Sequence, residues 1–250
     1  MASMRCAMAV LLLAACDGTL ASGGARAVSD QPVTLVAGDS TELVGSYDHP
    51  GGTAAGLLLL HGLGADRSEW DAVALPGYAT LAMDLRGHGE SGGDVPNDDG
   101  QVFVDDARIA LTWLASRPGV DAGRVAILGS SIGANVALAA AANDPDVGAV
   151  VLVSPSLDSL QISTEDDLRR YEPRPSLMYA TEEDTEAADA VETLVAQGGH
   201  VDATVLQGEE HGVALLLANP DAAAELVAWL EEHLVASQEP ESDGGMPDAE

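Results

Sequence analysis

The sequence contains no lysine, and its ten basic residues, all arginine, face 41 aspartate and glutamate residues. The formal net charge at pH 7 is −31 over 250 residues. A surface of this sign repels the phosphates of nucleic acids and the headgroups of anionic lipids. We therefore expect no nucleic-acid partner and no electrostatic attraction to a membrane.

Aromatic residues make up only 3% of the chain, although hydrophobic residues together reach 46%. A chain of this length can bury a sizeable core, and here that core has to be built from Ala, Val and Leu. Cysteine occurs only at Cys6 and Cys16. The sequence also lacks a metal-ligand cluster, a phosphate-binding loop and a nicotinamide fingerprint, so we expect no metal and no cofactor.

Residues 1–16 have the pattern of a removable export signal. One arginine precedes an apolar stretch at 7–15, which is too short to span a bilayer, and Cys16 follows. The motif LAAC at 13–16 resembles the lipobox of bacterial lipoproteins. This resemblance implies that Cys16 is lipidated and that the protein lies in the cell envelope. There the lipid on Cys16 would be its only contact with a bacterial membrane. A plain secretory signal and an unprocessed leader are the alternatives.

Composition divides the rest of the chain into parts. Residues 17–31 are rich in Gly, Ala and Ser without periodicity, and we interpret them as a flexible linker. Residues 32–236 alternate apolar runs with helical patterns, which predicts an α/β domain with a mostly parallel sheet of about eight strands and helices on both faces. Within it, residues 156–175 are expected to form a short lid. Residues 237–250 are interpreted as an acidic disordered tail.

A strand, a tight turn and a helix are predicted around the pentapeptide GSSIG at 129–133. This is the context of the G-x-S-x-G nucleophile elbow, in which glycines remove side chains that would collide in the sharp turn. The frame of the motif selects Ser131 over Ser130. Because the elbow lies at the carboxyl end of a strand, where open α/β sheets place their ligands, we predict that Ser131 is a nucleophile.

Two further reactive side chains follow later predicted strands. Asp184 ends an acidic loop, and His211 lies in the loop after the last predicted strand. Loops after parallel strands emerge at one edge of the sheet, so we expect these groups to meet Ser131 there. His211 can accept the serine proton, and Asp184 can hold the imidazole in the required tautomer. Glu182 and Glu183 compete with Asp184 for this role, and Asp184 could instead cap the following helix.

The loop after a buried strand contains the motif HGLG at 61–64. Backbone N–H groups of such a loop can point at a ligand, and we predict that the N–H groups of Leu63 and Ile132 bind a developing oxyanion. We assign His61 a packing role. His88 lies in a later glycine-rich loop, and we assign it to shaping that loop rather than to catalysis.

Together these motifs resemble the α/β-hydrolase family, over roughly residues 32–236. The order Ser, Asp, His along the chain is also that of this family. The small size and the short lid segment are most similar to dienelactone hydrolases and small carboxylesterases, while RGHG is similar to the motif of monoacylglycerol lipases and serine aminopeptidases. The matching stretches are HGLG (61–64), DLRGHGES (84–91), GSSIG (129–133), the loop reaching Asp184, and GEEHG (208–212).

The resemblance implies a serine hydrolase that cleaves a small carboxylic ester through an acyl-enzyme, with Ser131, His211 and Asp184 as the triad. Two alternatives stay open. Amide or peptide cleavage of the serine aminopeptidase type passes through the same tetrahedral intermediate. A catalytically inactive envelope protein could also bind a ligand on the same fold.

Overall fold

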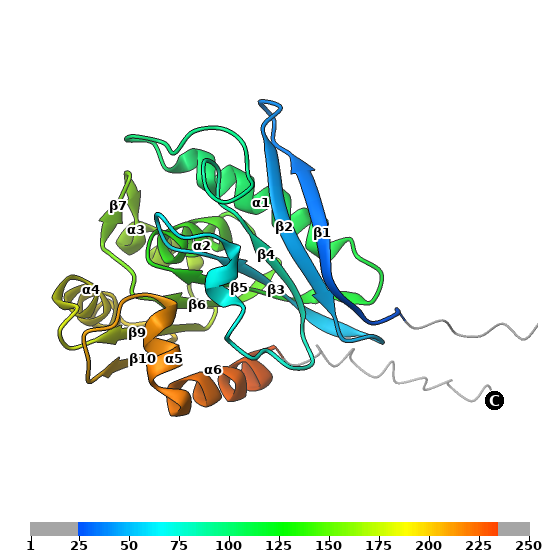
Figure 1. Cartoon of the computed structure of the whole chain (residues 1–250). Helices are drawn as coiled ribbons and strands as arrows, with labels where there is room; N and C mark the ends of the chain where they lie inside the picture. Colours follow the sequence, from blue (N-terminus) through cyan, green and yellow to red (C-terminus); the bar gives the residue numbers. More distant parts are fainter. Residues whose placement is uncertain (1–24, 235–250) are drawn as a thin grey trace, which may run out of the picture.

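The computed structural model describes residues 25–234 (Figure 1). The predicted signal segment with Cys16, the first part of the predicted linker and the predicted acidic tail lie outside these residues. Within the described residues, none of the helices is both long and apolar enough to cross a membrane.

The centre of the structure is a sheet of eight strands. The strands are β1 (Val28–Val36), β2 (Glu42–His49), β3 (Ala54–Leu60), β4 (Ala79–Met83), β5 (Val120–Ser130), β6 (Val147–Val153), β9 (Ser176–Thr181) and β10 (Val201–Leu206). Their order across the sheet is β1-β2-β4-β3-β5-β6-β9-β10. β2 runs antiparallel to both of its neighbours, and all the other pairs are parallel. The predicted mostly parallel sheet is confirmed.

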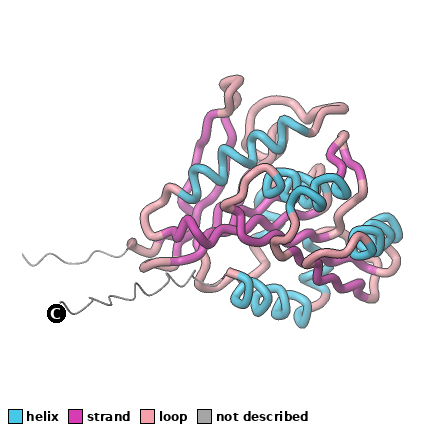
Figure 2. Tube along the Cα trace, turned by 180° about the vertical axis from the view of Figure 1, so that it is seen from behind, coloured by secondary structure: helices cyan, strands magenta, loops and turns pink. Residues whose placement is uncertain are grey.

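Helices cover both faces of this sheet, which Figures 1 and 2 show from opposite sides. The helices are α1 (Gln101–Ala115), α2 (Ile132–Ala142), α3 (Thr164–Tyr171), α4 (Thr185–Ala196), α5 (Val213–Ala218), α6 (Pro220–His233) and the 3-10 helix η1 (Arg67–Trp70). One face of the sheet is covered by α1, α2, α3 and α4, and the other face by η1, α5 and α6. Two apolar layers therefore enclose the central strands.

The strand β3 shows why continuous apolar runs mark the middle of the sheet. All seven of its residues are buried. Leu58 and Leu60 face the layer that contains α1 and α2, whereas Leu57 and Leu59 face the layer that contains α6. Successive side chains of a strand point to opposite faces, so a strand covered on both faces needs apolar residues at every position.

The first strand begins earlier than the sequence predicts. β1 starts at Val28, inside the segment interpreted as a linker (17–31). Gln31 pairs with Tyr47 of β2, and the backbone N–H of Asp30 donates to the Asp48 carboxylate. Strand pairing therefore orders a stretch whose polar composition resembles that of a linker.

The segment 156–175, expected to form a short lid, folds into regular structure. Its first half is a hairpin of β7 (Asp158–Ser159) and β8 (Ile162–Ser163), and α3 follows. Leu168 and Tyr171 of α3 are fully buried in the same apolar layer as α2. This segment is thus attached to the core through its own apolar side chains.

Candidate active site

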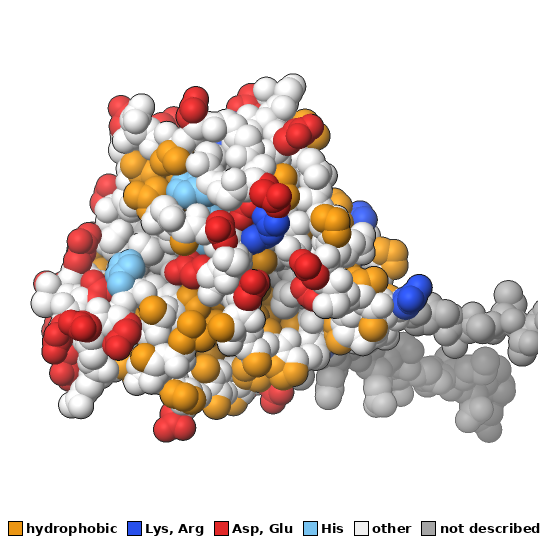
Figure 3. Space-filling model, in the orientation of Figure 1, with side chains coloured by type: hydrophobic (Ala, Val, Ile, Leu, Met, Phe, Trp, Pro, Cys, Tyr) orange, Lys and Arg blue, Asp and Glu red, His pale blue; other side chains and the backbone are white. Residues whose placement is uncertain are grey.

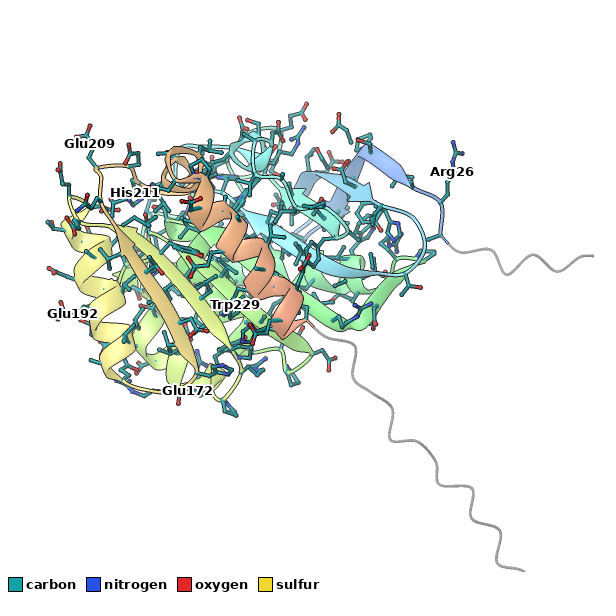
Figure 4. The ribbon with its side chains drawn as sticks, turned by 90° about the horizontal axis from the view of Figure 1, so that it is seen from below. Arg26, Glu172, Glu192, Glu209, His211 and Trp229 are labelled. Carbon is teal, nitrogen blue, oxygen red and sulfur yellow. The ribbon has the colours of Figure 1, made fainter. Side chains whose placement is uncertain are left out.

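The carboxyl ends of β5, β9 and β10 bring three remote side chains into contact. His211 Nε2 lies 2.8 Å from Ser131 Oγ, and His211 Nδ1 lies 2.6 Å from Asp184 Oδ2. Because the ionised carboxylate only accepts, Nδ1 carries the proton and Nε2 is free to accept from the Ser131 hydroxyl. Figure 4 shows His211 on the loop after β10, at the opposite end of the strands from Glu172.

The backbone of the elbow is strained at Ser131, which has φ 54° and ψ −122°. Two glycines make this turn sterically accessible. A Cβ on Gly129 would lie 2.1 Å from the carbonyl oxygen of Gly133, and a Cβ on Gly133 would lie 2.5 Å from that of Leu60. No side chain fits at either position, so the spacing of G-x-S-x-G follows from packing between β5, α2 and the end of β3.

The side chain of Asp184 contacts the imidazole instead of capping a helix. Asp184 is the N-cap residue of α4, yet its side chain makes no capping hydrogen bond there. The carboxylate is 14% exposed, compared with 52% for the His211 side chain that it accepts from. Glu182 and Glu183 are exposed. Of the three acidic residues considered from the sequence, Asp184 is the one hydrogen-bonded to His211.

Two backbone N–H groups beside Ser131 are free to bind an oxyanion. Ile132 is the first residue of α2, so its N–H has no partner within the helix. Leu63 follows Gly62, which lies so close to the serine that a Cβ added to it would be 3.3 Å from Ser131 Cβ. Among the described residues, the N–H groups of Leu63 and Ile132 make no hydrogen bond. The structure thus places both predicted oxyanion residues next to the serine.

Glu69, which no sequence motif marks, connects the loops of the site. Glu69 Oε2 accepts the Gly62 N–H at 2.8 Å, and Glu69 Oε1 accepts the Ser130 hydroxyl at 3.0 Å. Gly212 follows His211, and a Cβ added to Gly212 would lie only 3.1 Å from Glu69 Oε1. One half-buried carboxylate therefore lies under the elbow and under the loop of residues 61–64, the predicted oxyanion loop. Its sequence context, a glutamate in a short polar helix, carries no signal for this role.

Buried serine hydroxyls anchor the backbone that follows His211. Ser154 Oγ accepts the Gly212 N–H at 3.0 Å, and Ser130 Oγ accepts the Val213 N–H at 3.3 Å. Both serines are buried. Ser130 therefore holds the loops of the site together, while the neighbouring Ser131 presents its hydroxyl to the imidazole.

The two other histidines near the site are buried and bonded to backbone. His61 Nε2 accepts the Leu85 N–H at 2.9 Å, and its Nδ1–H donates to the Gly62 carbonyl at 2.7 Å. Burial lowers the pKa of His61, which keeps the ring neutral. His88 Nδ1 lies 3.0 Å from the Arg86 carbonyl oxygen. Both rings have the packing and loop-shaping places expected from the sequence.

The motif DLRGHGES has a structural explanation as well. Buried Asp84 accepts the backbone N–H groups of Arg67 and Glu90 at 2.8 Å each and pairs with the Arg67 guanidinium. Arg86 Nη2 lies 2.9 Å from buried Asp106 on α1. These contacts fix the loop after β4 against η1 and α1, beside the oxyanion loop.

The triad lies at the surface rather than inside a deep cavity. A cavity of about 760 Å³ does exist beside η1, lined by Arg67, Trp70 and Tyr78 among others, but no triad residue lines it. Figure 3 shows acidic side chains scattered over this face of the molecule, with few arginines among them. Glu182, Glu183 and Glu209, which are close in sequence to Asp184 and His211, are also exposed, so the surroundings of this open site are acidic.

Comparison with known proteins identifies the family to which the chain belongs. The family described as "Serine aminopeptidase, S33" (Hydrolase_4) matches residues 53–179. The chain belongs to this hydrolase family. The matched stretch includes the oxyanion loop and the elbow with Ser131, and it ends before Asp184 and His211.

Relatives in sequence cover part of the chain. The uncharacterized protein Rv2307c of Mycobacterium tuberculosis is 33% identical over 144 residues, which cover 55% of this chain and 50% of that protein. The esterase Rv0045c of the same organism is 34% identical over 119 residues, covering 46% of this chain and 38% of the esterase. The chain thus spans no more than half the length of these relatives.

Solved structures share the fold over most of the chain. The esterase Pf2001 of Pyrococcus furiosus has a TM-score of 0.68 at 20% identity, covering 82% of this chain and 91% of that one. DcsB, solved with a substrate analogue, has a TM-score of 0.69 at 17% identity and covers 82% of this chain and 99% of that one. The predicted α/β-hydrolase fold is confirmed, and at these identities the likeness establishes the fold alone.

Proposed function

We propose that this protein is a serine hydrolase that cleaves carboxylic esters through an acyl-enzyme formed on Ser131. The observation that carries the proposal is the continuous hydrogen-bonded chain from Ser131 through His211 to Asp184. Membership of a hydrolase family and the esterases among the similar proteins support ester cleavage as the reaction.

In the first half of the reaction, Ser131 Oγ attacks the ester carbonyl carbon while His211 Nε2 takes its proton. Asp184 stabilises the imidazolium that forms. The carbonyl oxygen becomes an oxyanion and accepts hydrogen bonds from the N–H groups of Leu63 and Ile132. Collapse of this intermediate breaks the bond to the alkoxy oxygen, which leaves as alcohol with the proton from His211.

In the second half, water attacks the acyl-serine and gives its proton to His211. A second tetrahedral intermediate collapses, the bond to Ser131 Oγ breaks, and Oγ recovers the proton. The carboxylic acid leaves. Every proton transfer runs through one imidazole, so the orientation given by Asp184 serves both halves.

The open site favours a small ester with a short acyl chain. His211 is half exposed and no triad residue lines the cavity beside η1, so a long acyl chain would find little apolar surface to bury against. The acidic surroundings favour neutral or cationic substrates over anionic ones. Both properties are expected to appear in substrate preference.

A fluorophosphonate probe tests the proposal directly, because it phosphonylates an activated serine. We expect covalent labelling of the intact, folded protein, loss of labelling in Ser131→Ala, and slower but still measurable labelling in Ser130→Ala, because Ser130 anchors the loops without being the nucleophile. Failure of the folded wild-type protein to react would overturn the proposal and favour an inactive binding protein.

A substrate panel separates the two enzymatic alternatives. We expect hydrolysis of short p-nitrophenyl esters, with rates that fall as the acyl chain lengthens, and little cleavage of aminoacyl p-nitroanilides. The reverse preference would assign the protein to peptide cleavage of the serine aminopeptidase type. In either case Ser131→Ala should abolish turnover.

We further infer that the protein acts in a bacterial cell envelope, held by a lipid on Cys16. The support is the motif LAAC at 13–16 after an apolar stretch. Metabolic labelling with a fatty-acid analogue should tag the wild-type chain and not a Cys16→Ser variant. Equal labelling of both would refute the anchor.

A further inference from the structure

A second group of reactive side chains lies at the amino end of β10. Ser131 lies at the carboxyl ends of the parallel strands, so the two groups are at opposite ends of the strands. His200 directly precedes β10, Asp202 is its second residue, and His233 is the last residue of α6. One ligand atom from each, an imidazole nitrogen or a carboxylate oxygen, lies within 4.8 Å of the others. Because His233 is remote in sequence, spacing alone does not reveal this group.

Trp229 of α6 orients two of these side chains. Its indole N–H donates to Asp202 Oδ2 at 2.8 Å, which leaves Oδ1 of the carboxylate available. Its carbonyl oxygen can only accept, so His233 Nδ1, 2.8 Å away, is the N–H donor and Nε2 keeps its lone pair. Figure 4 labels Trp229 on α6. Such outer hydrogen bonds are what position histidine and carboxylate ligands in metal sites.

Ring packing and exposure complete the arrangement. The indole of Trp229 stacks on His233 with centroids 4.2 Å apart, and the His200 ring meets His233 edge-on at 5.4 Å. His200 and Asp202 are exposed and His233 is half-buried, so an ion can enter from solvent and keep a water molecule. The carboxylate of Glu172 lies against Gly199, next to His200, and adds negative charge there.

We propose that His200, Asp202 and His233 bind one divalent transition metal ion of the zinc class. Two imidazoles, one carboxylate and a water provide the four ligands of tetrahedral Zn²⁺, whereas Ca²⁺ and Mg²⁺ prefer oxygen ligands throughout. The ion would join the edge strand β10 to the last turn of α6. Since the group is separate from the triad, its role is to stabilise the folded state, independently of the proposed catalytic function.

The test uses the full chain without an affinity tag, stripped of metal. Titration with Zn²⁺ by calorimetry is expected to show one site, and Co²⁺ should give the visible absorption of a tetrahedral complex. We expect the Kd for Zn²⁺ to rise by at least about tenfold in each of the variants His200→Ala, Asp202→Ala and His233→Ala. His211→Ala is the matched control, because it removes another exposed histidine that is paired with a carboxylate, and it should bind Zn²⁺ like the wild type.

Thermal unfolding gives a second readout that does not depend on activity. At the same Zn²⁺ concentration, the ion should raise the Tm of the wild type and of His211→Ala by equal amounts, and raise the Tm of His233→Ala clearly less. Trp229→Phe keeps the stacked ring but loses the indole donor, so its Kd should fall between those of the wild type and the ligand variants. Zn²⁺ binding that is absent in the wild type, or unaffected by the three ligand substitutions, would overturn the proposal.

Discussion

Replacing Glu69 by alanine tests whether this carboxylate holds the loop of residues 61–64 against the nucleophile elbow. The substitution removes the acceptor for the Gly62 N–H and the Ser130 hydroxyl, at 2.8 and 3.0 Å. A hydrogen bond to a charged group is worth about 1.5–3 kcal/mol, and the half-burial of Glu69 favours the lower end. We expect the free energy of unfolding to fall by about 3 kcal/mol, which for a domain of this size lowers Tm by about 6–12 °C.

The catalytic effect follows from the position of Gly62 directly before Leu63. Without Glu69 the loop that carries the Leu63 N–H loses its tie to the elbow, so the oxyanion donor is less well placed. Complete removal of such a donor costs about 10²–10³ in kcat in another hydrolase. Because Glu69 acts through the backbone, we expect kcat to drop by about tenfold to a hundredfold, with KM little changed.

Glu69→Gln is the matched control. Its amide oxygen can accept the Gly62 N–H while its NH₂ group donates to Ser130 Oγ, so the connection between loop and elbow survives. We expect kcat within about threefold of the wild type. The assay is steady-state hydrolysis of a short p-nitrophenyl ester, at a temperature where circular dichroism shows all three proteins folded. Unchanged kcat in the alanine variant, or equal losses in both variants, would refute the reasoning.

Three other substitutions test single contacts of the site. Burial lowers the pKa of His61 in the folded state, so the unfolded chain binds more protons below about pH 6.5. The free energy of unfolding should therefore decrease as pH falls from that value, by at most about 1.4 kcal/mol per pH unit. Urea unfolding at several pH values should show that the free energy of unfolding of His61→Gln depends less steeply on pH than that of the wild type. An equal pH dependence in the two proteins contradicts this. Gly129→Ala places a methyl group 2.1 Å from a carbonyl oxygen and should abolish fluorophosphonate labelling, whereas Gly38→Ala, with nothing within 4 Å, should label normally. Asp184→Asn should reduce kcat by up to about 10⁴, since the amide can favour the wrong imidazole tautomer, while Glu183→Gln should have no effect; loss of activity in the Glu183 variant instead would reassign the acid.

The parts of the fold that follow from local physics were accessible from the sequence. A strand covered on both faces, such as β3, has to be apolar throughout. The antiparallel pair β1 and β2 follows from two short strand patterns around a turn. Pro220 divides the last helical region into α5 and α6, because proline lacks the N–H that would continue α5.

The parts that depend on remote partners were not accessible. Glu69 and Ser130 are 61 positions apart, and nothing in the neighbours of either residue marks the contact. The same holds for α3, whose buried Leu168 and Tyr171 depend on the position of α2. In a sequence, a carboxylate that accepts two buried hydrogen bonds looks the same as one that faces water, because the difference lies in the groups opposite it.

The contact between Ser131, His211 and Asp184 lies between these two cases, and the register of β9 and β10 explains how the loops meet. The family match ends at residue 179, so it says nothing of Asp184 or His211. The last residues of the two strands, Thr181 and Leu206, pair with each other in a parallel register. The loops that follow therefore leave the sheet at the same height, and Asp184 and His211 need only short loops to meet. Once two strands are parallel and end together, residues a few positions past their ends converge, whatever their separation along the chain.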